Sequence, residues 1–267
     1  MDIPKRLYKY ESVNTYSLAN LKNQQVYFSK PINFNDPFDC AIGCTFKDIS
    51  QNDLEAIYEH YLTKSPSELE FKKKFGKNPN KYFLRFLQKS VEELFFKSRN
   101  EVLNNRGVTC FSELSDEILM WSHYADKHKG FCLEFDSQYE PFDKAIDVKY
   151  SKKISHVDPV SIILDSDPDQ VLKMVTTKYK SWEYEKEWRS IHTEGNVKFG
   201  YSSEALTGIY FGSKIDYAHF EIIALIIQGQ NPDVKLYEGS ISEDKYGVSF
   251  KEVRYMSYLK AKDCGMV

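Results

Sequence analysis

Apolar and polar side chains alternate in several short segments, which is the pattern of β-strands with one face in a core. In residues 131–136 (FCLEFD), Phe131, Leu133 and Phe135 fall on one face of the predicted strand. Other segments combine β-branched or aromatic residues with flanking turn residues. These predicted strands are 7–10, 24–29, 107–112, 187–192, 208–212, 221–227, 234–239 and 248–255.

Residues 50–105 follow a different pattern, with apolar residues at helical spacing and no strong strand signal. The clearest stripe includes Phe83, Leu87, Val91 and Phe95. We therefore predict an α+β protein with a mixed, mostly antiparallel sheet core and a helical insertion at about residues 50–105. Because no repeat or linker separates these regions, residues 1–267 are expected to form a single domain.

Composition narrows the possible functions. The net charge of -3 and the pI of about 6.1 exclude a basic protein that coats nucleic acid, and we find no strong nucleic-acid signal. The start of the chain, MDIPKRLYKY, is charged and has no apolar segment, so no signal peptide is expected. The run IIALII at 222–227 is too short to span a membrane, and the five cysteines have no framework spacing. We expect a cytoplasmic protein with reduced thiols and no membrane partner.

Two motifs suggest a polar binding site. In MWSHYADKHKG, His123 and Tyr124 could lie at the mouth of a pocket and be positioned by a buried Trp121. Alternatively, Trp121 and Tyr124 belong to the core and His123 is a hydrogen-bonded neighbour. In FNDPFD, Asn35 and Asp36 precede Pro37, and Asx residues in this position form turns with their own backbone. Such a rigid loop is a suitable wall for a polar ligand.

The segment SWEYEKEWRS, residues 181–190, allows two geometries. As a strand, it places Glu183, Glu185 and Glu187 on one face. As a helix, it pairs Glu185 with Arg189 at i, i+4 on a solvated surface. The β-forming EWRSI favours a strand from Glu187 onward. Clustered carboxylates suit metal binding, general base catalysis or stabilisation of a developing positive charge.

Taken together, these motifs resemble a bacterial family catalogued as domain of unknown function 2971. The resemblance covers most of the chain and is most specific in FNDPFD (34–39), MWSHYADKHKGFCLEF (120–135) and YEKEWR (184–189). The family implies no established activity, but the resemblance makes the motif residues better candidates for a functional site.

The order of these features also resembles the ADP-ribosyltransferase superfamily, whose members cleave NAD. That resemblance implies a basic residue on the first strand, a Ser on a second strand, a later Tyr and a late Glu-x-Glu. The matching positions in this chain are Lys9, Ser29, His123–Tyr124 and Glu185-x-Glu187. The first position departs from the Arg or His of the superfamily, since Lys meets phosphate as a point charge.

The resemblance also implies roles for these residues, with NAD as the substrate. Glu187 would bind the ribose, Glu185 the acceptor or a water, Tyr124 would stack on the nicotinamide, and His123 completes the catalytic group. Lys9 would meet the pyrophosphate. The remaining predicted cofactor-binding residues are Tyr10, Ser29, Asn35, Asp36 and Arg189. The expected partners are a nucleotide-type small molecule and an acceptor macromolecule of unknown identity.

The residues are also compatible with two other functions. A metal-dependent nuclease or hydrolase would gather carboxylates from Asp36, Asp39, Glu134, Glu185 and Glu187 around divalent ions. A non-enzymatic binding module would recognise a nucleotide or a partner with its aromatic residues. In that case Glu187 and Arg189 form a structural ion pair.

Overall fold

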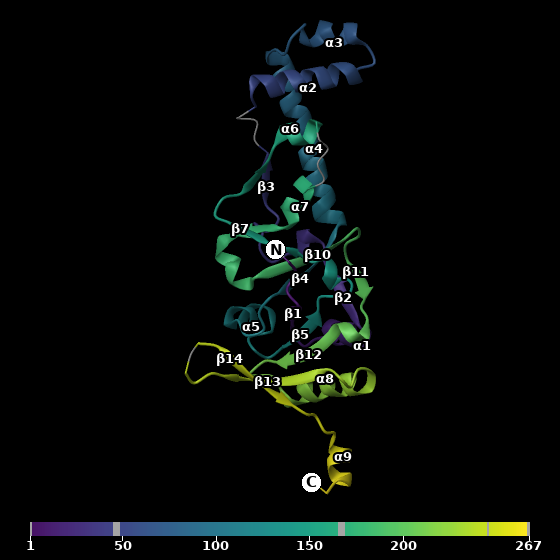
Figure 1. Cartoon of the computed structure of the whole chain (residues 1–267), viewed down its shortest axis with the longest axis vertical. Coiled ribbons are helices and arrows are strands. Elements are labelled where there is room, and N and C mark those ends of the chain that lie inside the picture. The colour runs from purple at the N-terminus through teal and green to yellow at the C-terminus, as the bar shows by residue number, and fades with distance from the viewer. Residues whose placement is uncertain (1, 45–48, 165–168, 245, 266–267) are drawn as a thin grey trace. The chain divides into compact units, whose positions relative to one another are not determined.

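The computed structural model describes residues 2–44, 49–164, 169–244 and 246–265 (Figure 1). The chain divides into two compact units. Unit 1 consists of Met1–Lys30, Gly107–Val148 and Ser181–Val267, and unit 2 consists of Pro31–Arg106 and Lys149–Lys180. The expected single domain over residues 1–267 stays a prediction.

In the described residues, unit 1 is built on an eight-stranded sheet with the order β14-β13-β12-β5-β1-β4-β10-β6. Its strand pairs are antiparallel except for β12 and β13, which are parallel. This mixed sheet and the helices of both units confirm the predicted α+β class. The strands are β1 (Arg6–Glu11), β4 (Gly107–Ser112), β5 (Phe131–Asp136), β6 (Ile146–Asp147), β10 (Glu187–His192), β12 (Leu206–Phe211), β13 (Lys235–Ile241) and β14 (Val248–Val253).

One face of this sheet, which we call the apolar face, carries the main core. Leu7, Phe135 and Ile209 are fully buried on it. Helices α1 (Thr15–Lys22) and α8 (Tyr217–Gln230) pack against this face through side chains such as Leu21 and Ile223. The two-stranded sheet of β2 (Gln25–Phe28) and β11 (Val197–Gly200) adds to the same core.

The strand register shows which residues lie on the opposite side of the sheet, which we call the polar face. Tyr8 pairs with Glu134 on one side and with Ser112 on the other, and Ser112 pairs with Glu187. Because paired residues share a face, these four side chains form one row across the sheet. Helix α5 (Ile118–Tyr124) covers part of this face, where the Trp121 ring meets Tyr10 edge-on at 5.1 Å between ring centres.

The sequence-based strand prediction for 221–227 is wrong, because EIIALII belongs to α8. Asp216 caps this helix by accepting a hydrogen bond from the backbone N–H of Ala218 at 2.8 Å. Ile223 and Ile227, four residues apart, are buried, whereas Ile222 is 43% exposed. A short apolar run cannot by itself distinguish a buried strand from a helix. None of the described helices has the length and apolar character needed to cross a membrane.

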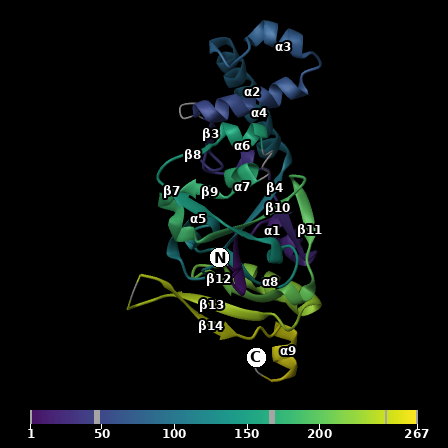
Figure 2. The same ribbon diagram turned by 45° about the horizontal axis from the view of Figure 1, so that its top comes forward.

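Unit 2 contains the predicted helical insertion (Figures 1 and 2). Ser50, Ser67 and Asn80 cap its three helices with their side chains. An aromatic-rich core around the buried Phe83 and Tyr58 joins these helices. The helices of unit 2 are α2 (Gln51–Lys64), α3 (Glu68–Phe75), α4 (Lys81–Asn105), α6 (Pro159–Leu164) and α7 (Asp169–Val175).

Unit 2 also contains two short parallel strand pairs. They are β3 (Ile42–Cys44) with β8 (Ser155–Val157), and β7 (Lys149–Ser151) with β9 (Thr177–Tyr179). The remaining short elements of the chain are η1 (Pro31–Asn33), η2 (Phe142–Lys144), η3 (Lys180–Glu185), η4 (Ser203–Ala205) and α9 (Tyr258–Asp263).

Candidate functional site

The acidic segment is a 3-10 turn followed by a strand. The predicted helical pair of Glu185 with Arg189 does not form, because Arg189 lies in the strand and binds Glu187. Residues Lys180–Glu185 form the 3-10 turn η3, and β10 begins at Glu187. Between them, Lys186 has a φ of 45°, which breaks the alternation. The strand predicted from Glu187 onward is therefore confirmed, but Glu183, Glu185 and Glu187 do not form one strand face.

The turn η3 brings Glu185 to the end of α5. The Tyr124 hydroxyl donates a hydrogen bond to Glu185 Oε1 at 2.7 Å. Glu185 is buried, with only 2% of its surface exposed. The buried Ser112 hydroxyl donates to the backbone carbonyl of Glu185 at 2.6 Å, which fixes the turn to β4. Tyr124 thus fixes the carboxylate of Glu185, and Ser112 fixes its backbone.

The His123 ring links this pair to two further aromatic rings, and its centre lies 6.3 Å from that of Tyr124. The His123 ring centre lies 6.3 Å from Trp182 and 6.5 Å from Tyr184, and those two rings lie 6.0 Å apart. We call His123, Tyr124, Trp182, Tyr184 and Glu185 the Tyr124–Glu185 site. It joins a buried carboxylate to several π surfaces, an arrangement that suits a planar or cationic ligand.

Glu187 has a different environment. Its two carboxylate oxygens accept hydrogen bonds from Arg189 Nε and Nη2 at 2.7 and 3.0 Å. The two residues are 4% and 0% exposed, so this is a buried, bidentate ion pair within one strand face. A ribose hydroxyl that bound Glu187 would have to share the carboxylate with Arg189.

The predicted N-terminal residues lie elsewhere on the sheet. Lys9 pairs with Leu133 on the apolar face, and its Nζ donates to the carbonyl of Cys110 at 3.4 Å. Since Glu187 lies on the polar face, the structure does not bring Lys9 together with it. Tyr10 is on the polar face and donates from its hydroxyl to the carbonyl of Leu114 at 2.7 Å.

The other predicted cofactor-binding residues are at turns and bridges. Ser29 forms an isolated antiparallel bridge with Val108 in unit 1. Asn35 and Asp36 belong to unit 2. Asp36 Oδ1 accepts a hydrogen bond from the Phe38 N–H at 2.8 Å, which is the turn expected of an Asx residue before proline.

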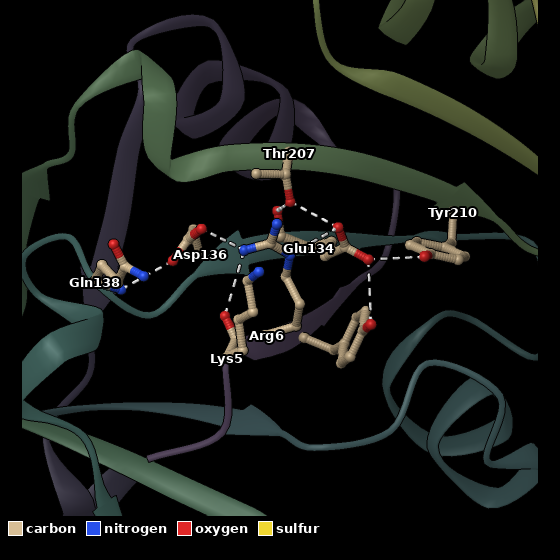
Figure 3. Close-up of polar contacts among 8 residues, drawn as sticks. Lys5, Arg6, Glu134, Asp136, Gln138, Thr207 and Tyr210 are labelled. Atoms are coloured by element: carbon tan, nitrogen blue, oxygen red, sulfur yellow. Dashed lines mark hydrogen bonds and ion pairs between the residues drawn. The ribbon is translucent and has the colours of Figure 1, made fainter. Parts of the chain in front are cut away.

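A second polar cluster surrounds Glu134, which the sequence indicated only as a possible metal ligand (Figure 3). Its carboxylate accepts hydrogen bonds from the hydroxyls of Tyr8, Thr207 and Tyr210 at 3.1, 2.6 and 2.8 Å. Arg6 Nε lies 3.5 Å from Glu134 Oε1, and Arg6 also forms an ion pair with Asp136. We call this group the Glu134 network.

A β-bulge builds this network. The register between β5 and β12 shifts between Leu206 and Gly208, so Thr207 points at Glu134. Burial and the nearby Glu134 charge raise the pKa of Tyr8 to about 12. Burial and the hydrogen bond to Glu134 also raise the pKa of Tyr210. Both phenols therefore stay protonated and act as donors at neutral pH.

Among the described residues, no group of three or more His, Cys, Asp or Glu side chains is arranged to hold a metal ion. Glu134 forms an ion pair with Arg6, Glu187 is hydrogen-bonded to Arg189, and Glu185 accepts a hydrogen bond from Tyr124. The described carboxylates therefore give the metal-dependent alternative no geometric support.

Fold and site together define an α+β protein with a carboxylate-bearing sheet face and an aromatic cluster at its side. The family model described as "Protein of unknown function (DUF2971)" matches residues 120–190, which include β5, most of α5 and the first four residues of β10. This match supports the family resemblance seen in the sequence, whereas no comparison supports the resemblance to ADP-ribosyltransferases. No curated protein and no solved structure matches the chain.

Proposed function

We propose that unit 1 binds NAD at the Tyr124–Glu185 site and cleaves the bond between nicotinamide and ribose. The observation that carries the proposal is the 2.7 Å hydrogen bond between Tyr124 and the buried Glu185, beside the rings of His123, Trp182 and Tyr184. The nicotinamide of NAD is a planar cation, and both aromatic faces and a carboxylate favour such a group.

The reaction needs a carboxylate at this position. When the carbon–nitrogen bond breaks, its electron pair leaves with nicotinamide and positive charge develops on the ribose. A fixed carboxylate stabilises that charge in the transition state. In hydrolysis, water supplies the new oxygen on the ribose and releases one proton, so the products are nicotinamide, ADP-ribose and a proton.

Arg189 occupies the carboxylate that the sequence assigns to the ribose. Both oxygens of Glu187 accept hydrogen bonds from Arg189. We assign the charge-stabilising role to Glu185 and a positioning role to Glu187 and Arg189. Lys9 has no part in this proposal, since it lies on the apolar face.

The test is incubation of the full chain with NAD, with nicotinamide release followed by chromatography. Glu185→Gln is expected to lower the release rate by about 10²- to 10³-fold, which is typical for loss of a group that stabilises transition-state charge. Tyr124→Phe should lower it less, because the carboxylate remains. The exposed Glu194→Gln removes the same charge and serves as the matched control.

Two results would contradict the proposal: no nicotinamide release by the wild type, with or without candidate acceptor macromolecules, or equal rates for Glu185→Gln and wild type. A second candidate function is a non-enzymatic nucleotide-binding module, which the arginine pairing of Glu187 and Glu134 favours. Saturable NAD binding without nicotinamide release, weakened by Glu185→Gln, would support that module instead.

A further inference from the structure

A concave cavity of about 330 Å³ lies within unit 2. Three segments form its wall: the Asp36 turn that leads into β3, the connection from β7 to β8, and β9. The parallel pairs β3–β8 and β7–β9 hold these segments in register. The cavity is therefore built by paired backbone and does not depend on one loose loop.

Large apolar side chains line the cavity and remain accessible. Phe38 is 66% exposed, and Ile154 and Tyr179 are each 50% exposed. The hydrogen bond from the Phe38 N–H to Asp36 Oδ1 fixes the turn that presents Phe38. A mainly apolar concave site with a few polar groups is the usual form of a small-molecule site.

The charged groups of the lining are mostly cationic. Lys152 and Lys153 are exposed, and neither forms an ion pair with another described residue. Lys178 also lines the cavity, and its Nζ lies 3.5 Å from Asp39 Oδ2 in a pair whose side chains are only 5% and 3% exposed. Among the described residues of the lining, Asp36 is the single acidic one and three are lysines, so this lining carries positive charge.

We propose that this cavity binds a small amphipathic anion: an aromatic or similarly flat apolar body that carries a carboxylate, sulfonate or phosphate. The body would contact Phe38, Ile154 and Tyr179, and the anionic group would face Lys152 and Lys153. A volume of about 330 Å³ is at the small end of ligand pockets, which fits one or two rings better than a polypeptide. Because every residue of the cavity belongs to unit 2, this inference is independent of the proposed NAD site.

The test uses two ligands that share a body and differ in charge. Binding of 2-naphthoate and of 2-naphthalenemethanol to the full chain is measured by calorimetry or by ligand-observed NMR. We expect 2-naphthoate to bind the wild type about 3- to 10-fold more tightly than the neutral alcohol, the effect of two partly screened surface charges. The double variant Lys152→Gln/Lys153→Gln should remove this difference and leave the affinity for the alcohol unchanged.

The apolar contacts need their own variant. Phe38→Ser should lower the affinity for both ligands by about 5- to 10-fold, as expected when one side of an apolar site is lost. The matched controls are Phe96→Ser and Lys73→Gln/Lys97→Gln, which make the same changes on exposed positions of α3 and α4. The proposal is overturned if neither ligand shows saturable binding, if both ligands bind the wild type equally, or if the controls weaken binding as much as the cavity variants.

Discussion

The Glu134 network makes a quantitative prediction about the stability of unit 1. In Tyr210→Phe, the ring keeps its stacking on Tyr237, at 4.4 Å between ring centres, and loses only the hydroxyl that donates to Glu134. A hydrogen bond to a charged acceptor contributes about 1.5–3 kcal/mol. Since Glu134 keeps its contacts with Tyr8, Thr207 and Arg6, we expect the low end, a loss of about 1.5 kcal/mol.

Tryptophan fluorescence measures this loss directly, because Trp121, Trp182 and Trp188 all belong to unit 1. With a urea m-value of about 2 kcal/mol/M, the unfolding midpoint should fall by about 0.75 M. Tyr246→Phe, at a position 99% exposed, is the control and should leave the midpoint unchanged. If Tyr210→Phe shifts the midpoint no more than this control does, the Tyr210 hydroxyl does not contribute the expected stability.

Two further predictions concern acid stability and the core of unit 2. Burial alone raises the pKa of Asp136, but the N–H of Gln138 and the Arg6 guanidinium outweigh it and the net shift is downward. The stability that Asp136 contributes is therefore complete above about pH 4 and is lost as the pH falls through its lower folded pKa. In Asp136→Asn, the urea midpoint measured by fluorescence should fall less steeply as the pH is lowered. An unchanged slope would contradict this prediction. In unit 2, Phe83→Ala removes a fully buried ring and should lower the free energy of unfolding by about 3–5 kcal/mol. The control Phe96→Ala, at a 54% exposed position, should lower it by less than about 1 kcal/mol. Unfolding is followed by circular dichroism at helix wavelengths.

Local patterns predicted the elements well where one physical signal dominated. The helices within 50–105 have capping residues and a 3.6-residue apolar stripe, and the strand 131–136 has strict alternation. The prediction for 221–227 was wrong because an unbroken apolar run fits both periods. Helix α1 was missed, although Asn14 and Ser17 form a capping box that the sequence contains.

The candidate site was only partly predictable. Tyr124 and Glu185 were named from their motifs, and the structure brings them into contact. The Glu134 network was not, because it depends on the register of β1 against β5 and on the bulge at Thr207. Tyr8 and Glu134 are 126 residues apart, and single-sequence patterns give the face of each strand but not its partner. The opposite orientation of Lys9 follows from the same register.

The position of β1 in the sheet has a consequence for synthesis on the ribosome. The first strand of the chain lies between β4 and β5, whose residues begin only at Gly107 and Phe131. At about 5–20 residues per second, β1 waits roughly 5–20 s for its first neighbour. During that time the apolar side chain of Leu7 and both backbone edges of β1 have no partner within the sheet, and unpaired strand edges tend to pair with other chains. Productive folding of unit 1 thus depends on events that follow the synthesis of the helices of residues 51–105.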